Sequence, residues 1–129
     1  MIPQLLLGMG AIQSCATGRA TLLGYDSLPA TPVAGDNVTL WVAYTVPGAA
    51  VTGGTATYKV TLNGIPLPAT VDPLCTQTTC PKDTGVAYNE TSWSLFPSGL
   101  AGKIVSRIEW ADQDAAPLWG VETTWRVSG

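Results

Sequence analysis

The chain has 129 residues, the length of one ordinary domain, and can bury roughly two thirds of its unfolded surface around a single core. Only 12% of the residues are charged and the formal net charge is −3, so no basic surface is available for phosphate backbones and nucleic acid is not expected as a partner. The 14 glycines, 10 prolines and 46% hydrophobic residues exclude disorder and indicate short strands joined by turns.

The first 14 residues, MIPQLLLGMGAIQS, form an apolar stretch. They resemble the core of a secretory signal, although no Lys or Arg precedes them. The stretch is too short to cross a bilayer as a helix, and no other segment approaches that length. We expect residues 1–14 to be a retained arm or the remnant of a signal segment, and residues 15–129 to form one domain.

Apolar and polar residues alternate with a period of two between clusters of Pro, Gly and Asp, which is typical of half-buried antiparallel strands. Six or seven strands are predicted, the first near 20–25 and the others at 37–46, 55–63, 85–96, 102–111 and 118–127. No helix of useful length is visible. This pattern predicts an all-β chain, with an immunoglobulin-like sandwich of two antiparallel sheets.

The alternation also predicts which side chains face inward. In the second predicted strand Val38, Leu40, Val42, Tyr44 and Val46 share one face, and Trp41 lies on the other. The inward faces of the later strands are predicted to carry the following residues: Ala56, Tyr58, Val60, Leu62, Ile104, Ile108, Trp110, Trp119, Val121, Trp125 and Val127.

Two cysteines stand five positions apart in LCTQTTCP, residues 74–81. The chain has no histidine, and its three cysteines cannot complete a four-ligand zinc site, so no metal is expected. A thioredoxin-like centre has two residues between its cysteines, not four. A structural disulfide between Cys75 and Cys80 is therefore favoured, which implies an oxidising compartment. Two free thiols in a cytosolic loop are the alternative.

Nothing in the sequence indicates catalysis. Without histidine the commonest general base is absent, and no nucleophile stands beside another base. The carboxylates Glu109, Asp112 and Asp114 invite a glycosidase or calcium interpretation, but DQDAAP is most simply a hairpin turn. No enzyme activity and no cofactor are expected.

Two N-glycosylation sequons occur, at Asn37 (NVT) and Asn89 (NET). They carry meaning only if the chain passes through a secretory lumen.

Four segments in order resemble the MD-2-related lipid-recognition (ML) family, which includes the Niemann-Pick type C2 sterol carriers. They are GIPLP (64–68), C-x4-C-P (75–81), FPSGLAGKIVSRIEWADQD (96–114) and LWGVE (118–122). The resemblance covers the chain from about Cys15 to Val127. It implies an immunoglobulin-like sandwich whose sheets splay to admit a lipid, without catalysis.

The chain departs from the family at its disulfides. Family members commonly join an early cysteine to one in the final hairpin, and Cys15 matches the early site, but Gly120 stands at the late one. SLPATP, residues 27–32, replaces a further small disulfide. The resemblance therefore implies that Cys15 has no partner within the chain and is either buried or bonded to another chain.

The resemblance together with the inward faces gives the candidate lipid contacts. They are Tyr58, Val60, Leu62, Tyr88, Trp93, Phe96, Ile104, Ile108, Trp110 and Trp119. The predicted function is to hold a sterol or acyl-chain lipid between the sheets, in a secreted or lumenal compartment. The alternative is a structural, immunoglobulin-like subunit of a larger assembly, with protein contacts along the N-terminal arm and around Trp41. For each candidate residue, core packing without a ligand is the other interpretation.

Overall fold

The computed structural model describes residues 12–29, 33, 35–95 and 102–127. Within these ranges the chain forms nine strands and one short helix. Their bounds are β1 (Ile12–Ala16), β2 (Thr21–Leu28), β3 (Asn37–Thr45), β4 (Gly54–Leu62), β5 (Ile65–Pro66), β6 (Thr70–Pro73), α2 (Leu74–Gln77), β7 (Ala87–Leu95), β8 (Gly102–Asp112) and β9 (Pro117–Val127). The six predicted strands correspond to β2, β3, β4, β7, β8 and β9.

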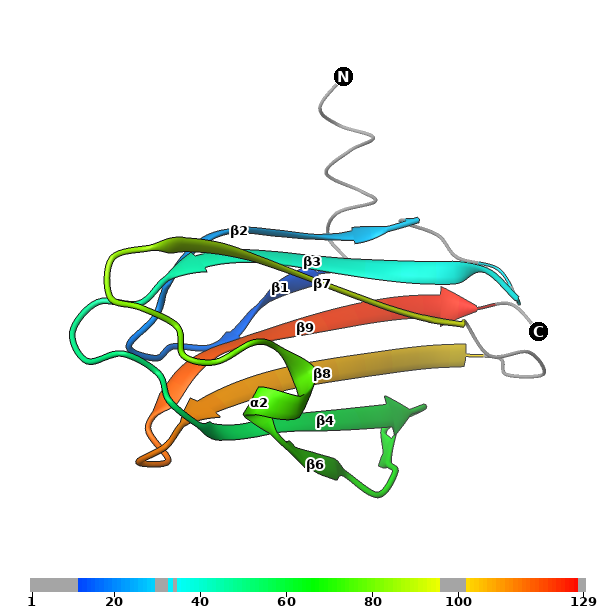
Figure 1. Cartoon of the computed structure of the whole chain (residues 1–129). Coiled ribbons are helices and arrows are strands. Elements are labelled where there is room, and N and C mark those ends of the chain that lie inside the picture. The colour runs from blue at the N-terminus through cyan, green and yellow to red at the C-terminus, as the bar shows by residue number, and fades with distance from the viewer. Residues whose placement is uncertain (1–11, 30–32, 34, 96–101, 128–129) are drawn as a thin grey trace.

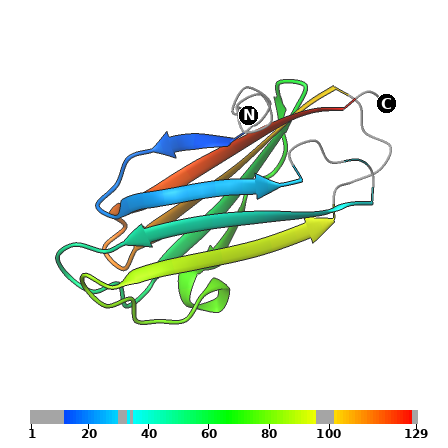
Figure 2. The ribbon, with the colours of Figure 1, turned by 90° about the horizontal axis from the view of Figure 1, so that it is seen from above.

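The strands form two antiparallel sheets that face one another (Figures 1 and 2). The larger sheet has the order β1-β9-β8-β4-β5, with β6 also paired to β4, and the smaller sheet has the order β2-β3-β7. The predicted two-sheet sandwich is therefore confirmed. The three elements that the sequence pattern did not predict, β1, β5 and β6, all lie at the edges of the larger sheet.

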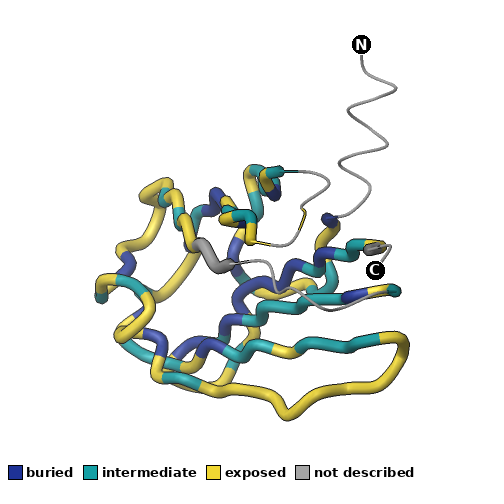
Figure 3. The backbone as a smooth tube through the Cα atoms, turned by 90° about the vertical axis from the view of Figure 1, so that its right-hand side faces the viewer, coloured by how far each residue is buried: buried dark blue, intermediate teal, exposed yellow. Residues whose placement is uncertain are grey.

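The predicted inward faces are buried between the sheets. On β3, Val42 and Tyr44 are almost fully buried, whereas the neighbouring Trp41 is 39% exposed on the outer face. Figure 3 shows buried positions gathered where the sheets face each other and exposed positions in the loops. Strand alternation therefore assigns the faces correctly, because each strand has one dry side.

The main core lies at one end of the sandwich. Tyr44 contacts Trp110 and Trp119, with ring centroids 6.1 and 6.0 Å away, and the two indole rings are 4.7 Å apart. Val46, Val51, Leu74 and Leu118 close this end and are at most 1% exposed. A smaller cluster lies at the other end, where Val38 and Ile104 pack with Val60, Leu62 and Trp125. We call these two regions the aromatic end and the far end.

The aromatic end is held by an ion pair under the final hairpin. Arg19 Nε donates to Asp112 Oδ2 at 2.7 Å, and Asp112 Oδ1 accepts the backbone N–H groups of Asp114 and Ala116. Burial opposes ionisation of Asp112, but the hydrogen bond from Arg19 and the two backbone N–H groups outweigh it and hold the pKa of Asp112 below its ordinary value. The prediction that DQDAAP forms a hairpin turn is thus confirmed.

The outer face of the larger sheet is polar. Lys59 pairs with Glu109 at 3.0 Å, and Arg107 lies between Glu109 and Glu122 at 3.7 and 3.8 Å. This face is therefore solvated, and the apolar surface of the sheet points to the interior.

The division of the chain at residue 14 stays a prediction. β1 begins at Ile12 and pairs with β9, and the residues before Ile12 lie outside the described part of the chain. Across residues 12–29, 33, 35–95 and 102–127, no helix has the length and apolar character needed to cross a membrane.

Candidate functional site

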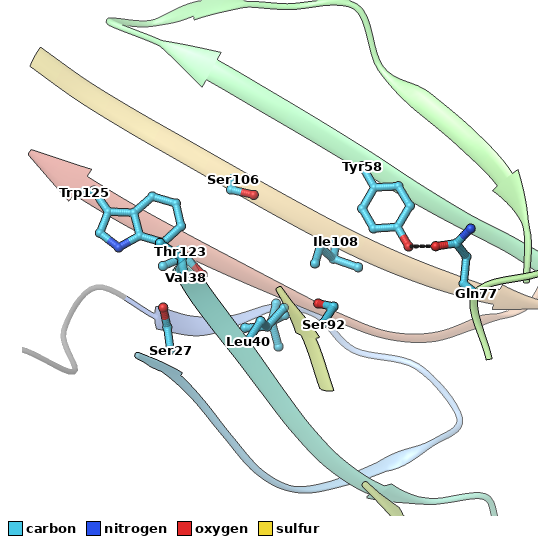
Figure 4. A pocket seen from close by; sticks show the side chains of 11 residues that line it. Ser27, Val38, Leu40, Tyr58, Gln77, Ser92, Ser106, Ile108, Thr123 and Trp125 are labelled. Carbon is cyan, nitrogen blue, oxygen red and sulfur yellow. Dashed lines mark hydrogen bonds between the residues drawn. The ribbon is translucent and has the colours of Figure 1, made fainter. Parts of the chain in front are cut away.

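A cavity of about 270 Å³ lies between the two sheets (Figure 4). Six strands and α2 contribute to its wall, which mixes apolar side chains with hydroxyl groups. The lining residues are Ser27, Val38, Leu40, Tyr58, Gln77, Ser92, Ser106, Ile108, Val121, Thr123 and Trp125.

The strand register explains why this space is not filled. One row of the larger sheet, Val60-Ser106-Thr123, carries two small hydroxyl side chains, and the smaller sheet contributes the row Ser27-Leu40-Ser92. At the aromatic end the corresponding row of the larger sheet contains Trp110 and Trp119. Small polar side chains replace large ones toward the far end, so the facing sheets leave a void.

The rim of the cavity is formed by α2. Tyr58 Oη donates a hydrogen bond of 3.0 Å to Oε1 of Gln77, which is exposed at the end of α2 (Figure 4). Burial raises the pKa of Tyr58, and the charge of Asp72 raises it further, so the phenol stays protonated and can donate. The cavity thus opens beside a polar pair.

The disulfide fixes the loop that carries this rim. Cys75 and Cys80 are bonded, as predicted from their spacing, and the closed loop contains Gln77. Leu74 anchors the start of the loop in the core and is 0% exposed. Closing so short a loop is worth about 2 kcal/mol in the chain-entropy model. The cysteine pair therefore positions one wall of the cavity.

A smaller recess of about 50 Å³ extends toward the aromatic end. It shares Leu40, Tyr58, Gln77, Ser92 and Ile108 with the main cavity. Its remaining walls include Trp110 and Trp119, whose indole Nε1–H groups are buried without a hydrogen-bond partner in the described part of the chain.

Glu90 lies at the edge of this recess and is already engaged. It accepts hydrogen bonds from Tyr44 Oη and Thr78 Oγ1, both at 2.9 Å, and it pairs with the buried Lys82 at 3.2 Å. Burial raises the pKa of Tyr44, and the nearby carboxylate of Glu90 raises it further. The charge of Glu90 is therefore compensated within the fold, and its position is structural.

The predicted contact residues fall into four groups. Tyr58 and Ile108 line the cavity, and Trp110 and Trp119 line the recess. Val60, Leu62 and Ile104 pack in the far-end cluster beside the cavity. Tyr88 packs against Tyr44 with ring centroids 5.8 Å apart and accepts the backbone N–H of Asp83. The side chain of Trp93 and the whole of Phe96 lie outside the described part.

Sequence reasoning missed the polar part of the lining. Ser106 stands two residues from both Ile104 and Ile108, and Thr123 stands between Val121 and Trp125, so the same alternation that assigned the apolar residues places both hydroxyls inside. The signal was therefore present, but it was applied to apolar residues alone.

Cys15 is a free cysteine, as expected, and is half-buried. Arg107 Nε donates to its sulfur at 3.2 Å. A Cβ placed on Gly120 would lie 3.1 Å from the Cys15 sulfur, close to the roughly 3 Å that a disulfide sets between one Cβ and the partner's sulfur. Gly120 thus occupies the position of the missing partner. Among residues 12–29, 33, 35–95 and 102–127, no cluster of three or more His, Cys, Asp or Glu residues has metal-binding geometry.

The family model described as ML domain matches residues 12–126. The chain belongs to the ML domain family. None of the curated proteins matches it in sequence.

Solved structures show the same ML fold at low sequence identity. A Niemann-Pick type C2 protein from the Japanese carpenter ant superposes with a TM-score of 0.71 at 11% identity, over 91% of this chain and 98% of that one. Chicken MD-1, solved in complex with lipid IVa, gives 0.55 at 10% identity, over 89% and 96%. The DNA glycosylase AlkC of Pseudomonas fluorescens, bound to abasic-site DNA, gives 0.59 at 12% identity over 85% of this chain, which matches 31% of the enzyme.

Proposed function

We propose that this ML domain binds a lipid between its two sheets and acts as a carrier without catalysis. The observation that carries the proposal is the cavity of about 270 Å³ between the sheets of a chain that belongs to this family. Chicken MD-1, which has the same fold, was solved with a lipid.

The size of the cavity limits the ligand. Sites for small molecules commonly measure about 300–1,000 Å³, and this cavity lies at the small end of that range. It suits one acyl chain or one compact molecule such as a sterol, and not a lipid with several chains. Each hundred Å² of apolar ligand surface that leaves water contributes about 2.5 kcal/mol, from which the ordering of ligand and side chains subtracts.

The wall supports binding and not chemistry. Its polar groups are hydroxyls and one amide, none of them beside a histidine, because the chain has none. Hydroxyls of this kind orient a ligand by hydrogen bonding, whereas nucleophilic catalysis needs a neighbouring base. The predicted contact residues Tyr58, Ile108, Trp110 and Trp119 are proposed to touch the ligand directly. Val60, Leu62 and Ile104 are proposed to support it from behind.

The disulfide supports a secreted or lumenal location, because such bonds persist in oxidising compartments. In that setting Asn37 and Asn89, which are both exposed at the surface of the smaller sheet, are proposed to carry glycans. Treatment with a glycosidase should then lower the mass of the secreted chain, and an unchanged mass would remove this part of the proposal.

The proposal is tested by filling the cavity. Ser106→Trp places an indole in the cavity, whereas Val105→Trp, the control, places the same side chain on the outer face of the same strand. We expect native mass spectrometry to find a bound lipid in the wild type and in Val105→Trp, and none in Ser106→Trp. Circular dichroism should show that all three are folded. A folded Ser106→Trp protein that retains the lipid would refute the cavity as the site.

A second candidate function is a structural subunit of a larger assembly. Trp41 favours it, because this indole is 39% exposed on the outer face of β3 and Leu23 on the adjacent strand is 58% exposed. Trp41 also has a role within its own sheet, since its ring lies over Gly24, where an added Cβ would approach it to 3.2 Å. Wild-type protein that carries no lipid and assembles through a Trp41-dependent contact would favour this second candidate.

A further inference from the structure

The inner end of the cavity is polar. The rim residues Gln77 and Ser92 are exposed, whereas Ser27 and Thr123, at the other end of the lining, are only 5% and 4% exposed. Ser27 comes from β2 in the smaller sheet and Thr123 from β9 in the larger one (Figure 4). Two hydroxyls from opposite sheets therefore meet where the cavity is most enclosed.

These positions are unusual for hydroxyl groups. Thr123 stands between Val121 and Trp125 on the inward face of β9, and the strand partner of Ser27 is Leu40. Ser27 Oγ is buried and has no hydrogen-bond partner in the described part of the chain. A buried hydroxyl without a partner destabilises a fold, and most buried polar groups are paired. Ser27 therefore faces the cavity with an unused donor and acceptor.

The charges around the cavity restrict what this hydroxyl binds. The lining contains no Lys or Arg. The nearest carboxylate among the recess residues is Glu90, which would repel an anion. An ionised carboxylate in this space would lose its water without gaining a cation, which is strongly unfavourable. A neutral oxygen meets no such obstacle.

We propose that the cavity selects a neutral oxygen-bearing lipid, an alcohol, ketone or ester, whose oxygen is held at the inner end by Ser27 and Thr123. This inference rests on the proposed lipid-binding function and specifies its ligand class. The oxygen of the ligand supplies the missing partner of Ser27, and the apolar part packs against Leu40, Ile108 and Val121 toward the rim. Because a serine hydroxyl both donates and accepts, it serves alcohols and carbonyl groups alike.

The experiment compares three ligands with the same chain length: lauryl alcohol, laurate and dodecane. Each is titrated against full-length protein preloaded with a fluorescent naphthylamine probe at neutral pH, so that laurate is ionised. The variants are Ser27→Ala and Thr123→Val, which remove one hydroxyl each, and Ser14→Ala, an exposed control outside the cavity. Thermal melting of every variant reports on folding.

Lauryl alcohol should bind the wild type more tightly than dodecane or laurate. Ser27→Ala and Thr123→Val should each weaken the alcohol by about three- to tenfold, the value of one hydrogen bond, and leave dodecane unchanged. Ser14→Ala should match the wild type. The melting temperature of Ser27→Ala without ligand should not fall, because the variant removes an unpaired hydroxyl.

Several outcomes overturn the proposal. If the three ligands bind equally, or if laurate binds tightest, the ligand class is wrong although lipid binding itself stands. Equal losses of alcohol and dodecane binding together with a lower melting temperature would make Ser27 a structural residue only. If neither the naphthylamine probe nor any ligand binds the folded wild type, the proposed function fails and the ligand class fails with it.

Discussion

The two ends of the sandwich are built from the same strands and differ in what those strands place inside. At the aromatic end β8 and β9 contribute Trp110 and Trp119, which pack on Tyr44 from the smaller sheet. A few residues along, the same two strands contribute Ser106 and Thr123, and the space between the sheets is open. Stability and binding are thus separated along the strands, so one end can change while the other persists.

The largest expected effect comes from emptying the aromatic end. Trp119 is 3% exposed and contacts both Tyr44 and Trp110, so Trp119→Ala should reduce the free energy of unfolding by about 3–5 kcal/mol. Trp125→Ala, in the wall of the cavity, should cost clearly less because that side chain is only partly buried. Denaturant unfolding of both variants measures the difference. Equal losses would erase the distinction between the two ends.

A new crosslink should stabilise the fold without changing the cavity. Gly120→Cys brings a second sulfur to Cys15 on the outer face of the larger sheet, where β1 meets β9. The bond closes a loop of about 100 residues and should add about 2–4 kcal/mol under oxidising conditions. Gly120→Ala is the control, and its Cβ lies 2.9 Å from that of Ala16, so it should gain nothing. Stability that is unchanged by a reductant would show that the bond does not form.

The ion pair at the aromatic end should matter less than the aromatic packing. Asp112→Asn removes the charge that Arg19 Nε contacts at 2.7 Å, and should destabilise the protein by about 2–3 kcal/mol. Ligand affinity should stay unchanged, because Asp112 lies outside the lining residues. Urea unfolding and probe titration of the same preparation test both statements. A variant that loses affinity while it keeps its stability would contradict the separation of the two ends.

The smallest expected effect is a dependence of stability on pH. Because the pKa of Asp112 is lowered in the folded protein, its contribution is complete above its unfolded pKa of about 3.9 and disappears as the pH falls through the lower folded value. Wild type should therefore lose more stability than Asp112→Asn between pH 5 and pH 2, both values taken as about the ends of the acid transition. Parallel curves for the two proteins would assign the acid sensitivity to other groups.

Much of the fold could be predicted from the sequence because six strands alternate clearly. β1 could not, since in IQSCA only Ile12 is buried and the strand continues an apolar stretch. β5 and β6 could not either, because they have two and four residues and contain Pro66 and Pro73, which are poor indicators of a strand. Pairing with longer neighbours, and not local preference, makes these segments strands.

The site was predicted in part for a related reason. Alternation places Ile108 and Trp110 inside correctly, but it does not distinguish a filled interior from an open one. That distinction depends on which side chains from the two sheets meet, and Ser27 comes from a strand predicted only as far as residue 25. The register across three strands, which brings Ser106 beside Thr123, cannot be read from any one of them.

The two short strands beside β4 have a consequence for self-association. A long exposed strand at the edge of a sheet offers a row of N–H and C=O groups to another copy of the chain, and this is a common start of aggregation. Here the edge beyond β4 is divided between β5 and β6, and each contains a proline that has no N–H to offer. The side of the larger sheet next to the cavity rim is thereby protected against extension into an intermolecular sheet.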